Sequence, residues 1–332
     1  MTSGRRDLTV ARIAALAGVS APTVSRVVNG QPGVAPATRE RVEEVLREQG
    51  YRRPEVAPAA VLELVFHALE SQWALEIIRG VEHAARAHGL AVLLTEMQGR
   101  LTPEKAWTEQ ILARRPTGVV AVFSELTVAQ QSRLATQEIP LVVVDPTGEP
   151  LHETPSVGAT NWTGGLSATR HLLGLGHRRI AAVGGPVRWP CCRARLDGHR
   201  AAMDAAGVPA ELIREEVLYV EGGLRAAREL LALPEPPSAI VCANDLQAMG
   251  VYRAAREAGV RVPEELSVVG FDDLDFAAWA GPPLTTVRQP LFRMGATAVD
   301  LVAELAAGRR PEEHRVELGT TLVVRESTGP LL

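Results

Sequence analysis

Hydrophobic residues follow two different spacings in two parts of the chain. In the first 50 residues they recur every three or four positions, as in Val10, Ile13, Ala14 and Ala17, which is the period of an amphipathic helix. The pattern predicts a first helix over residues 10–17, which Gly18 ends. A second helix is expected after Ser20, ending at Asn29 and Gly30, and a third is expected over residues 37–49.

From Leu62 onward, apolar runs of strand length alternate with amphipathic helical segments. Nine runs are predicted as strands, at residues 62–69, 90–96, 118–124, 141–145, 156–160, 179–185, 217–222, 239–244 and 267–273. Continuous apolar strands that alternate with helices are typical of a mainly parallel sheet covered on both faces. Because nine strands are too many for one compact open sheet, we expect two α/β lobes.

The second predicted helix has a small, polar and cationic outer face. Two short helices joined by a tight turn form a helix-turn-helix, and slim exposed side chains let the second helix approach base edges in a major groove. We predict base contacts for Ala21, Pro22 and Arg26, and phosphate contacts for Thr23, Ser25 and Asn29. Thr9 and Ser20, which can cap the first two helices, belong to the same predicted DNA-binding set. The alternative is a three-helix bundle with a purely structural role.

The charge of the chain is uneven along its length. The first 60 residues hold nine arginines against six acidic residues, a balance of +3, although the whole chain carries −4. A basic head on an acidic body indicates that only the head meets a polyanion such as DNA.

The head resembles a known family. The segments VARIAALAGVSAPTVSRVVNG and VAPATRERVEEVLREQGYRRP are similar to the DNA-binding head of the lac-repressor (LacI/GalR) family. The resemblance implies a homodimer on a palindromic operator of double-stranded DNA. Residues 54–60 lack the arginine-and-leucine hinge motif of that family and contain Pro54 and Pro58, which disfavour a regular helix. We therefore predict a short linker, with Arg52 and Arg53 on phosphates.

Aromatic and polar residues gather at the ends of the predicted strands, where α/β sheets bind their ligands. The predicted effector-binding set is Trp73, Asp145, Asn161, Trp162, Trp189, Arg195, Asn244, Asp272 and Trp279. Indole faces stack on sugar rings, and carboxylates, amides and guanidinium groups bind hydroxyls, so the set favours a saccharide. The alternative for each tryptophan is ordinary packing, and Asp145, which precedes a proline, can be a turn former.

The body resembles the effector domain of the same family, which is similar to periplasmic sugar-binding proteins. The resemblance rests on segments such as RARLDGHRAAMDAAG and SVVGFDD, and it implies that Arg195, Asn244 and Asp272 bind sugar hydroxyls. It also implies three crossings between lobes, near Thr160, Gln289 and Thr320. The segments QWALEIIRGVE and GATNWTGG resemble actinobacterial members that respond to plant-wall sugars such as xylose, xylobiose or cellobiose.

Other classes of protein find little support in the sequence. There is no P-loop, nucleophile elbow or dinucleotide fingerprint, and the three cysteines have no metal-ligand spacing, so we expect no enzyme activity, cofactor or metal. No apolar run is long enough to cross a membrane and no secretory signal begins the chain, so a cytoplasmic location is expected.

These observations combine into one expected architecture and function. We expect an all-α helix-turn-helix head at residues 1–53, a linker at 54–60, and a two-lobed α/β effector and dimerisation domain at 61–332. Lobe 1 is expected at residues 61–159 and 290–318, and lobe 2 at residues 160–289 and 319–332. The expected function is a sugar-utilisation repressor that a small saccharide releases from its operator. The alternatives are an effector-promoted repressor, an activator, and a sugar-binding module without a regulatory role.

Overall fold

The computed structural model describes residues 10–28, 33–49, 59–69, 71–123, 125–146, 154–309, 311 and 313–331. The chain divides between residues 57 and 58 into two units, which are called the head and the body here. Four predicted DNA-contacting residues lie outside the described residues, namely Thr9, Asn29, Arg52 and Arg53. Of the predicted linker, residues 54–58 also lie outside them, whereas residues 59 and 60 already belong to the first strand of the body.

The head consists of three helices around a small apolar core. They are α1 (Val10–Ala17), α2 (Ala21–Val28) and α3 (Pro36–Glu48), within a residue of the predicted bounds. The core is built from Ile13, Ala14, Ala17, Val24, Val27 and Val42. Apolar positions at helical spacing on each segment therefore bring α1 and α2 together as predicted.

The first sheet of the body is wholly parallel among its described pairs, and it defines lobe 1. Its strands are, in spatial order, β11 (Arg315–Leu318), β5 (Ser156–Ala159), β4 (Leu141–Val144), β3 (Pro116–Val122), β1 (Ala59–Phe66) and β2 (Ala91–Glu96). Helices α4 (Gln72–Ala87) and α12 (Leu291–Ala306) pack on one face, and α5 (Lys105–Arg114) and α6 (Val128–Thr136) pack on the other. Coverage on both faces explains why the strands are continuously apolar.

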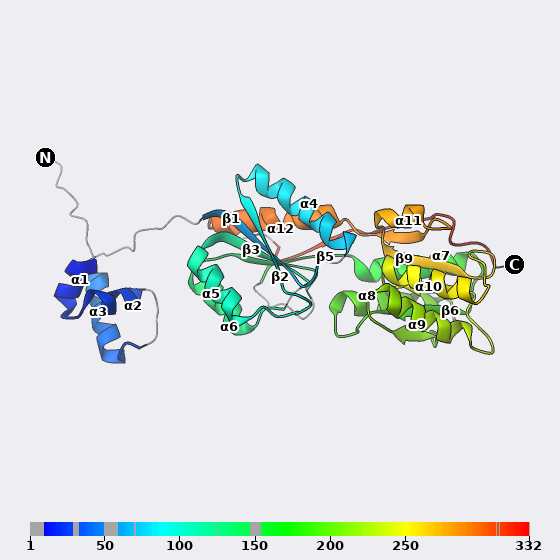
Figure 1. Cartoon of the computed structure of the whole chain (residues 1–332), viewed down its shortest axis with the longest axis horizontal. Helices are drawn as coiled ribbons and strands as arrows, with labels where there is room; N and C mark the ends of the chain where they lie inside the picture. Colours follow the sequence, from blue (N-terminus) through cyan, green and yellow to red (C-terminus); the bar gives the residue numbers. More distant parts are fainter. Residues whose placement is uncertain are drawn as a thin grey trace. The chain divides into compact units, whose positions relative to one another are not determined.

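The second sheet defines lobe 2, and all its pairs are parallel except β10 with β12. Its strands are β12 (Thr321–Val323), β10 (Thr285–Arg288), β9 (Ser267–Asp272), β8 (Ala239–Cys242), β6 (Ile180–Gly184) and β7 (Ile213–Glu215). Helices α7 (Asn161–Gly174) and α8 (Pro190–Ala205) cover one face, and α9 (Val220–Leu231), α10 (Asp245–Glu257) and the short α11 (Asp275–Trp279) cover the other. Figure 1 shows the two sheets of the body, each with helices on both faces.

The chain passes between the two sheets at three places. It leaves lobe 1 at Thr160, returns from lobe 2 at Gln289 and Pro290, and leaves lobe 1 again at Gly319 and Thr320. Two of these crossings are tied together, because the backbone N–H of Thr320 donates to the Thr160 hydroxyl at 2.9 Å and the two hydroxyls lie 3.0 Å apart. The pocket described below lies where the lobes face each other.

One predicted strand was wrong. The segment 217–222 is not a strand: residues 217–219 form a loop, Val220 begins α9, and the edge strand lies earlier at β7. The short strands β10, β11 and β12 were not among the predicted strands. From Val220 onward the segment belongs to α9, which packs closely on α10.

Candidate functional site

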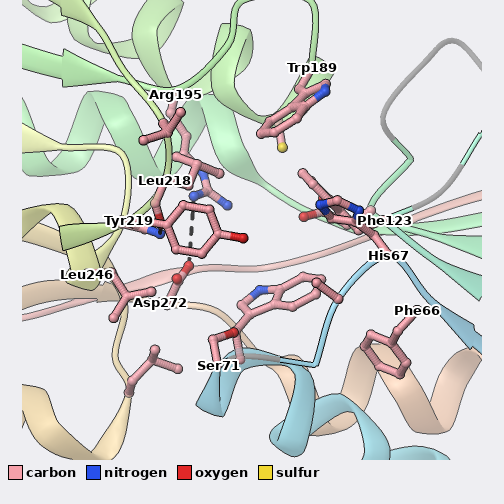
Figure 2. A pocket seen from close by; sticks show the side chains of 17 residues that line it. Phe66, His67, Ser71, Phe123, Trp189, Arg195, Leu218, Tyr219, Leu246 and Asp272 are labelled. Carbon is pink, nitrogen blue, oxygen red and sulfur yellow. Dashed lines mark hydrogen bonds and ion pairs between the residues drawn. The ribbon is translucent and has the colours of Figure 1, made fainter. Parts of the chain in front are cut away.

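The carboxyl ends of the strands of both lobes line a pocket of about 160 Å³, which is called the inner pocket here. Lobe 1 contributes residues that follow β1, β3 and β4, and lobe 2 contributes residues that follow β6, β7, β8 and β9. Figure 2 shows Phe123 and Trp189 facing the same space as Arg195 and Asp272. The pocket therefore has an aromatic part and a polar part.

Phe123 is the centre of the aromatic part. Its ring centroid lies 4.8 Å from that of Trp189 and 6.0 Å from that of Trp73, and both pairs are edge-to-face. The His67 ring lies 5.8 Å from Phe123 on the β1 side. Edge-to-face pairs of this kind are favourable because the positive ring edge meets the negative face. Three of these rings, Phe123, Trp73 and His67, belong to lobe 1 and Trp189 belongs to lobe 2, so the aromatic part joins the lobes.

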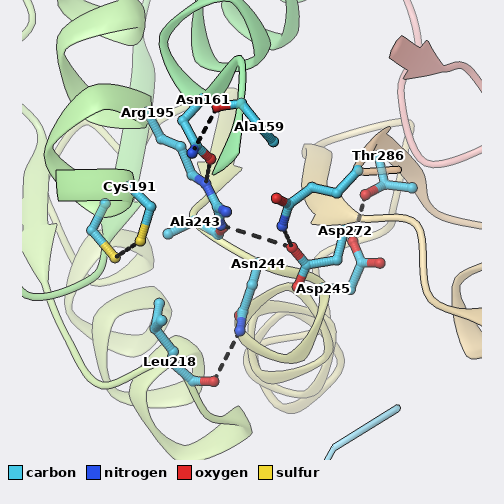
Figure 3. Close-up of polar contacts among 12 residues, drawn as sticks. Ala159, Asn161, Cys191, Arg195, Leu218, Ala243, Asn244, Asp245, Asp272 and Thr286 are labelled. Atoms are coloured by element: carbon cyan, nitrogen blue, oxygen red, sulfur yellow. Dashed lines mark hydrogen bonds and ion pairs between the residues drawn. The ribbon is translucent and has the colours of Figure 1, made fainter. Parts of the chain in front are cut away.

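Arg195 is the centre of the polar part. This part, called the polar floor here, consists of Arg195, Asp272 and Asp145. The Nε of Arg195 donates to Asn161 Oδ1 at 2.8 Å and its Nη1 donates to the carbonyl of Ala243 at 2.6 Å (Figure 3). Its guanidinium carbon also lies 3.8 Å from the centroid of the Phe271 ring, in cation–π contact. These contacts fix a buried guanidinium that α8 places in the first turns of the helix. Nη1 also lies 3.8 Å from Asp272 Oδ1.

Two buried carboxylates stand around this guanidinium. Burial raises the pKa of the Asp272 carboxyl to about 7, although Arg195 and a hydrogen bond from Gln289 Nε2 at 2.6 Å pull it down. Burial likewise raises the pKa of Asp145, which Arg195 opposes. The Asp272 carboxyl is therefore near the balance between its acceptor and donor forms at neutral pH, so ligand hydroxyls can decide which form prevails.

Three residues that line the pocket have left-handed backbone conformations. The φ angles of Phe123, Asp145 and Asp272 are 48°, 49° and 114°. Each residue ends a strand or directly follows one, and non-glycine residues adopt such angles rarely, with a cost that surrounding structure must offset. The strained turns aim these side chains into the pocket instead of continuing the strands.

Asn244 and Asp245 show how neighbouring polar residues take different roles. Asn244 caps α10, where its Oδ1 accepts the N–H of Gln247 at 2.9 Å and its Nδ2 donates to Leu218 O at 3.0 Å. Asp245 is fully buried and accepts hydrogen bonds from Leu274 N and the Thr286 hydroxyl. Asn244 lines the pocket, whereas Asp245 supports the loop after β9.

The structure gathers six of the nine predicted effector-binding residues around the inner pocket. They are Trp73, Asp145, Trp189, Arg195, Asn244 and Asp272. Asn161 lies behind them, where it holds Arg195 and donates to the carbonyl of Ala159. Trp162 lines a neighbouring cavity.

Trp279 lies apart from both cavities. It ends the short helix α11, and its side chain is 78% exposed because the buried residue of that helix is Ala277. The expectation that every tryptophan near a strand end faces one ligand does not match this geometry.

Sequence reasoning missed several residues that line the pocket. Phe123 directly follows β3, so the rule that ligands lie beyond strand ends could have found it. His67 follows β1 in the same way. Tyr219 was missed because its segment was assigned to a strand, and Cys191 carried no signal beyond its place at the start of α8.

The head presents the outer face of α2 to solvent. Ala21, Pro22, Ser25 and Arg26 are exposed and Thr23 is half-buried. Ser20 begins the helix, since its Oγ accepts the N–H of Thr23 at 3.3 Å and lies 2.8 Å from the Thr23 hydroxyl. The face predicted to meet bases is therefore slender and carries one cation.

The described residues offer no metal centre and no membrane span. No group of three or more histidine, cysteine, aspartate or glutamate side chains in this part of the chain could hold a metal ion. Among the same residues, every helix is too short or too polar to cross a bilayer. The three cysteines are buried free thiols.

Comparisons with known proteins agree with this picture. Residues 9–54 match a model described as bacterial regulatory proteins, lacI family, and residues 169–328 match a periplasmic binding protein-like domain. The HTH-type transcriptional regulator MalR of Streptomyces coelicolor is 36% identical, over 96% of each chain.

Two solved structures resemble the whole chain. The complex of the transcriptional regulator CelR with cellobiose is similar at a TM-score of 0.72 and 33% identity, covering 96% of this chain and 99% of that chain. The lac repressor dimer bound to operator and an anti-inducer is similar at a TM-score of 0.72 and 27% identity, covering 98% of this chain and all of that chain.

Proposed function

Because the chain belongs to the lacI family of bacterial regulatory proteins and is an HTH-type transcriptional regulator rather than an enzyme, we propose that it is a saccharide-responsive repressor. In this proposal a homodimer occupies a palindromic operator in the cytoplasm, and a small saccharide releases it. The observation that carries the proposal is the inner pocket, in which aromatic rings face the buried polar groups Arg195 and Asp272.

The exposed face of α2 suits contact with a major groove. Ala21 and Pro22 keep the helix surface slim, so its backbone can approach base edges, and Arg26 can donate two hydrogen bonds to a guanine. Ser20 and Thr23 suit contacts with phosphates, which supply most of the affinity. Two heads of a dimer would occupy successive half-sites.

The inner pocket suits a sugar ring. The faces of Trp73 and Trp189 can cover the C–H groups of the ring, and Arg195, Asp272 and Asp145 can bind its hydroxyls. The cellobiose bound to CelR supports this class of ligand.

The polar floor is linked directly to two of the crossings between lobes. Gln289 lies at the second crossing and bonds to Asp272, and Asn161 follows Thr160 at the first crossing and bonds to Arg195. A ligand that moves Asp272 or Arg195 therefore acts on the segments about which the lobes turn. We infer that the saccharide binds one lobe angle more tightly than the other, which is the requirement for shifting the equilibrium between DNA-binding and released states.

The two halves of the proposal are tested separately in the full chain. Arg26→Ala is expected to lower the preference for operator over random DNA by about 1–3 kcal/mol, while saccharide affinity measured by titration calorimetry stays the same. Arg41→Ala, which removes an exposed cation of α3, is the matched control and keeps the preference. Asp272→Ala is expected to lose saccharide binding and to keep operator binding. Unchanged operator preference in Arg26→Ala would reject the proposed base contact. Unchanged saccharide affinity in Asp272→Ala would reject the proposed saccharide site.

A further inference from the structure

A second cavity adjoins the inner pocket, and it is called the outer cavity here. It has a volume of about 540 Å³ and lies between β5, the first turns of α7 and α8, and β11. Its lining includes Trp162, Arg193, Asp197, Arg315 and Glu317. Asp145 and Cys191 line both cavities, so these two side chains form a shared wall.

The inner pocket is too small for a long ligand. Its volume of about 160 Å³ is close to that of an engineered cavity of about 150 Å³ that admits one benzene molecule. Pockets for drug-sized ligands begin at about 300 Å³. The inner pocket therefore suits one six-membered ring, and a second sugar unit must lie outside it.

A chain of sugar rings that occupied both cavities would pass beside the shared wall of Asp145 and Cys191. Cys191 has a small side chain, which leaves more room at this wall than most residues would. The carboxylate of Asp145 stands beside it, where it can accept a hydroxyl of either ring. One ligand in both cavities would therefore meet Asp145 between its first and second units.

Trp162 offers a stacking surface in the outer cavity. Trp162 is 46% exposed, although its main chain, in the first turn of α7, packs closely against α8. A Cβ added at Gly198 of α8 would lie 2.1 Å from the carbonyl oxygen of Trp162, which shows how closely the two helices approach. A large aromatic side chain that is exposed in a cavity on a fixed backbone gains by burial under a sugar ring.

The polar residues around Trp162 have the mixed character that sugar hydroxyls require. Arg193 and Arg315 are donors, and Asp197 and Glu317 are acceptors, so the cavity has no single charge that would favour an ionic ligand. Asp197 already pairs with Arg200 at 3.0 Å, which leaves its other lone pairs for a ligand. Both signs of charge around one aromatic face favour a neutral, hydroxyl-rich ring.

We propose that the outer cavity is a second sugar subsite and that Trp162 is its stacking residue. The effector is then a disaccharide or longer saccharide whose first ring occupies the inner pocket. This inference rests on the proposed saccharide-responsive function. Trp162 then selects ligands with a second sugar ring and does not take part in binding the first ring.

The test compares matched sugars on the full chain by titration calorimetry. The pairs are xylose with xylobiose and glucose with cellobiose. For one pair, the wild-type protein is expected to bind the disaccharide at least tenfold more tightly than the monosaccharide. Trp162→Ala is expected to weaken the disaccharide about tenfold and to leave monosaccharide affinity within about twofold, since one stacking contact contributes roughly 1–1.5 kcal/mol.

Two further variants complete the test, one as a control and one as a second change in the outer cavity. Trp279→Ala removes another exposed tryptophan that lines neither cavity, and it is expected to change neither affinity. Arg315→Gln alters the far side of the outer cavity on β11 and is expected to weaken only the disaccharide. The inference is overturned if Trp162→Ala leaves disaccharide affinity unchanged, or if it weakens both sugars equally. A wild-type protein that binds monosaccharides alone overturns the subsite, and one that binds no sugar overturns the proposed function as well.

Discussion

The guanidinium of Arg195 lies 3.8 Å from the carboxylate of Asp272, and the exposed fractions of the two side chains are only 8% and 6%. Arg195 belongs to α8 and Asp272 ends β9, so the pair joins two layers of lobe 2. Charges taken out of water are costly unless they are paired and hydrogen-bonded. The pair is therefore both the polar floor of the inner pocket and a point on which the stability of lobe 2 depends.

Arg195→Met is expected to lower both stability and effector affinity. Removal of one partner leaves Asp272 buried without its counter-charge, which typically costs about 3–5 kcal/mol in the free energy of unfolding. Urea unfolding measures the loss of stability, and calorimetry with the effector measures the loss of affinity. Arg200→Met is the matched control on the same helix, because its ion pair with Asp197 is exposed and worth about 0–1 kcal/mol. Equal stability of the two variants would contradict the role of Arg195.

The affinity for the effector is expected to rise as the pH increases from 6 to 8. Burial raises the pKa of Asp272 to about 7 in the free protein, and a sugar hydroxyl donates best to the ionised carboxylate. Binding therefore releases a proton, which calorimetry in buffers of different ionisation enthalpy detects. Asp272→Asn removes this titration, so any affinity left in that variant should not vary over the same range. A flat profile in the wild-type protein would contradict the assignment.

The same carboxyl gives the free protein a stability trend of opposite direction. The pKa of Asp272 is higher in the folded chain than its value of about 4 in an unfolded chain. Between pH 4 and pH 7 the unfolded state therefore holds fewer protons, and this group lowers the free energy of unfolding as the pH rises. Chemical denaturation of wild type and Asp272→Asn at pH 5 and pH 7 measures the difference, which should be smaller in the variant.

Gly165→Ala and Gly174→Ala are expected to have opposite effects within one helix. A Cβ at Gly165 of α7 would lie 2.1 Å from the carbonyl oxygen of Arg195, so the helices must separate and the guanidinium must move. Overpacking of this kind costs about 1–3 kcal/mol and should also weaken the effector. Gly174 has nothing within 4 Å and an ordinary φ, so alanine there should be neutral or stabilising by about 0.5–1 kcal/mol. Thermal unfolding compares the stability of the two variants. A Gly165→Ala protein as stable as the wild type would show that α7 and α8 are not tightly packed.

Phe123→Ala is expected to weaken the effector about tenfold or more. The Phe123 ring holds Trp73 and Trp189 by edge-to-face contacts, each worth about 0.5–1.5 kcal/mol, so its loss frees both indoles. Tryptophan fluorescence should show a smaller change on saturation, because the rings are no longer ordered around the ligand. Binding as tight as in the wild-type protein would mean that the rings are held by other contacts.

Local sequence signals were sufficient for most of the fold. Gly18 and the Ser20 cap indicated where the first helix ends and the second begins, and continuous apolar runs indicated the central strands of both sheets. The chain changes sheet near Thr160, Gln289 and Thr320, the three positions that the family resemblance implied. Strand ends also pointed to most of the polar floor, because parallel strands bring their carboxyl ends to one edge.

Long-range packing accounts for the errors. The residues Val217 to Val220 have strand-like composition, yet Gly223 lets α9 approach α10 so closely that a Cβ there would lie 1.9 Å from Gln247 O. That contact favours a helix from Val220 onward, with residues 217–219 as the loop before it, and no local pattern reveals it. Trp162 and Trp279 follow strands as Trp189 does, but only the three-dimensional course of α7 and α11 shows that they do not line the inner pocket.

The proposed repressor couples saccharide binding to DNA release, and fluorescence anisotropy on the DNA upstream of its own gene measures this coupling. Wild-type protein and Asp272→Ala are bound to labelled DNA and titrated with xylose, xylobiose and cellobiose. We expect tight, salt-sensitive binding by both proteins, which one saccharide reverses in the wild type and no saccharide reverses in Asp272→Ala. Binding that no saccharide weakens, or that one strengthens, would contradict release by a saccharide in the inner pocket.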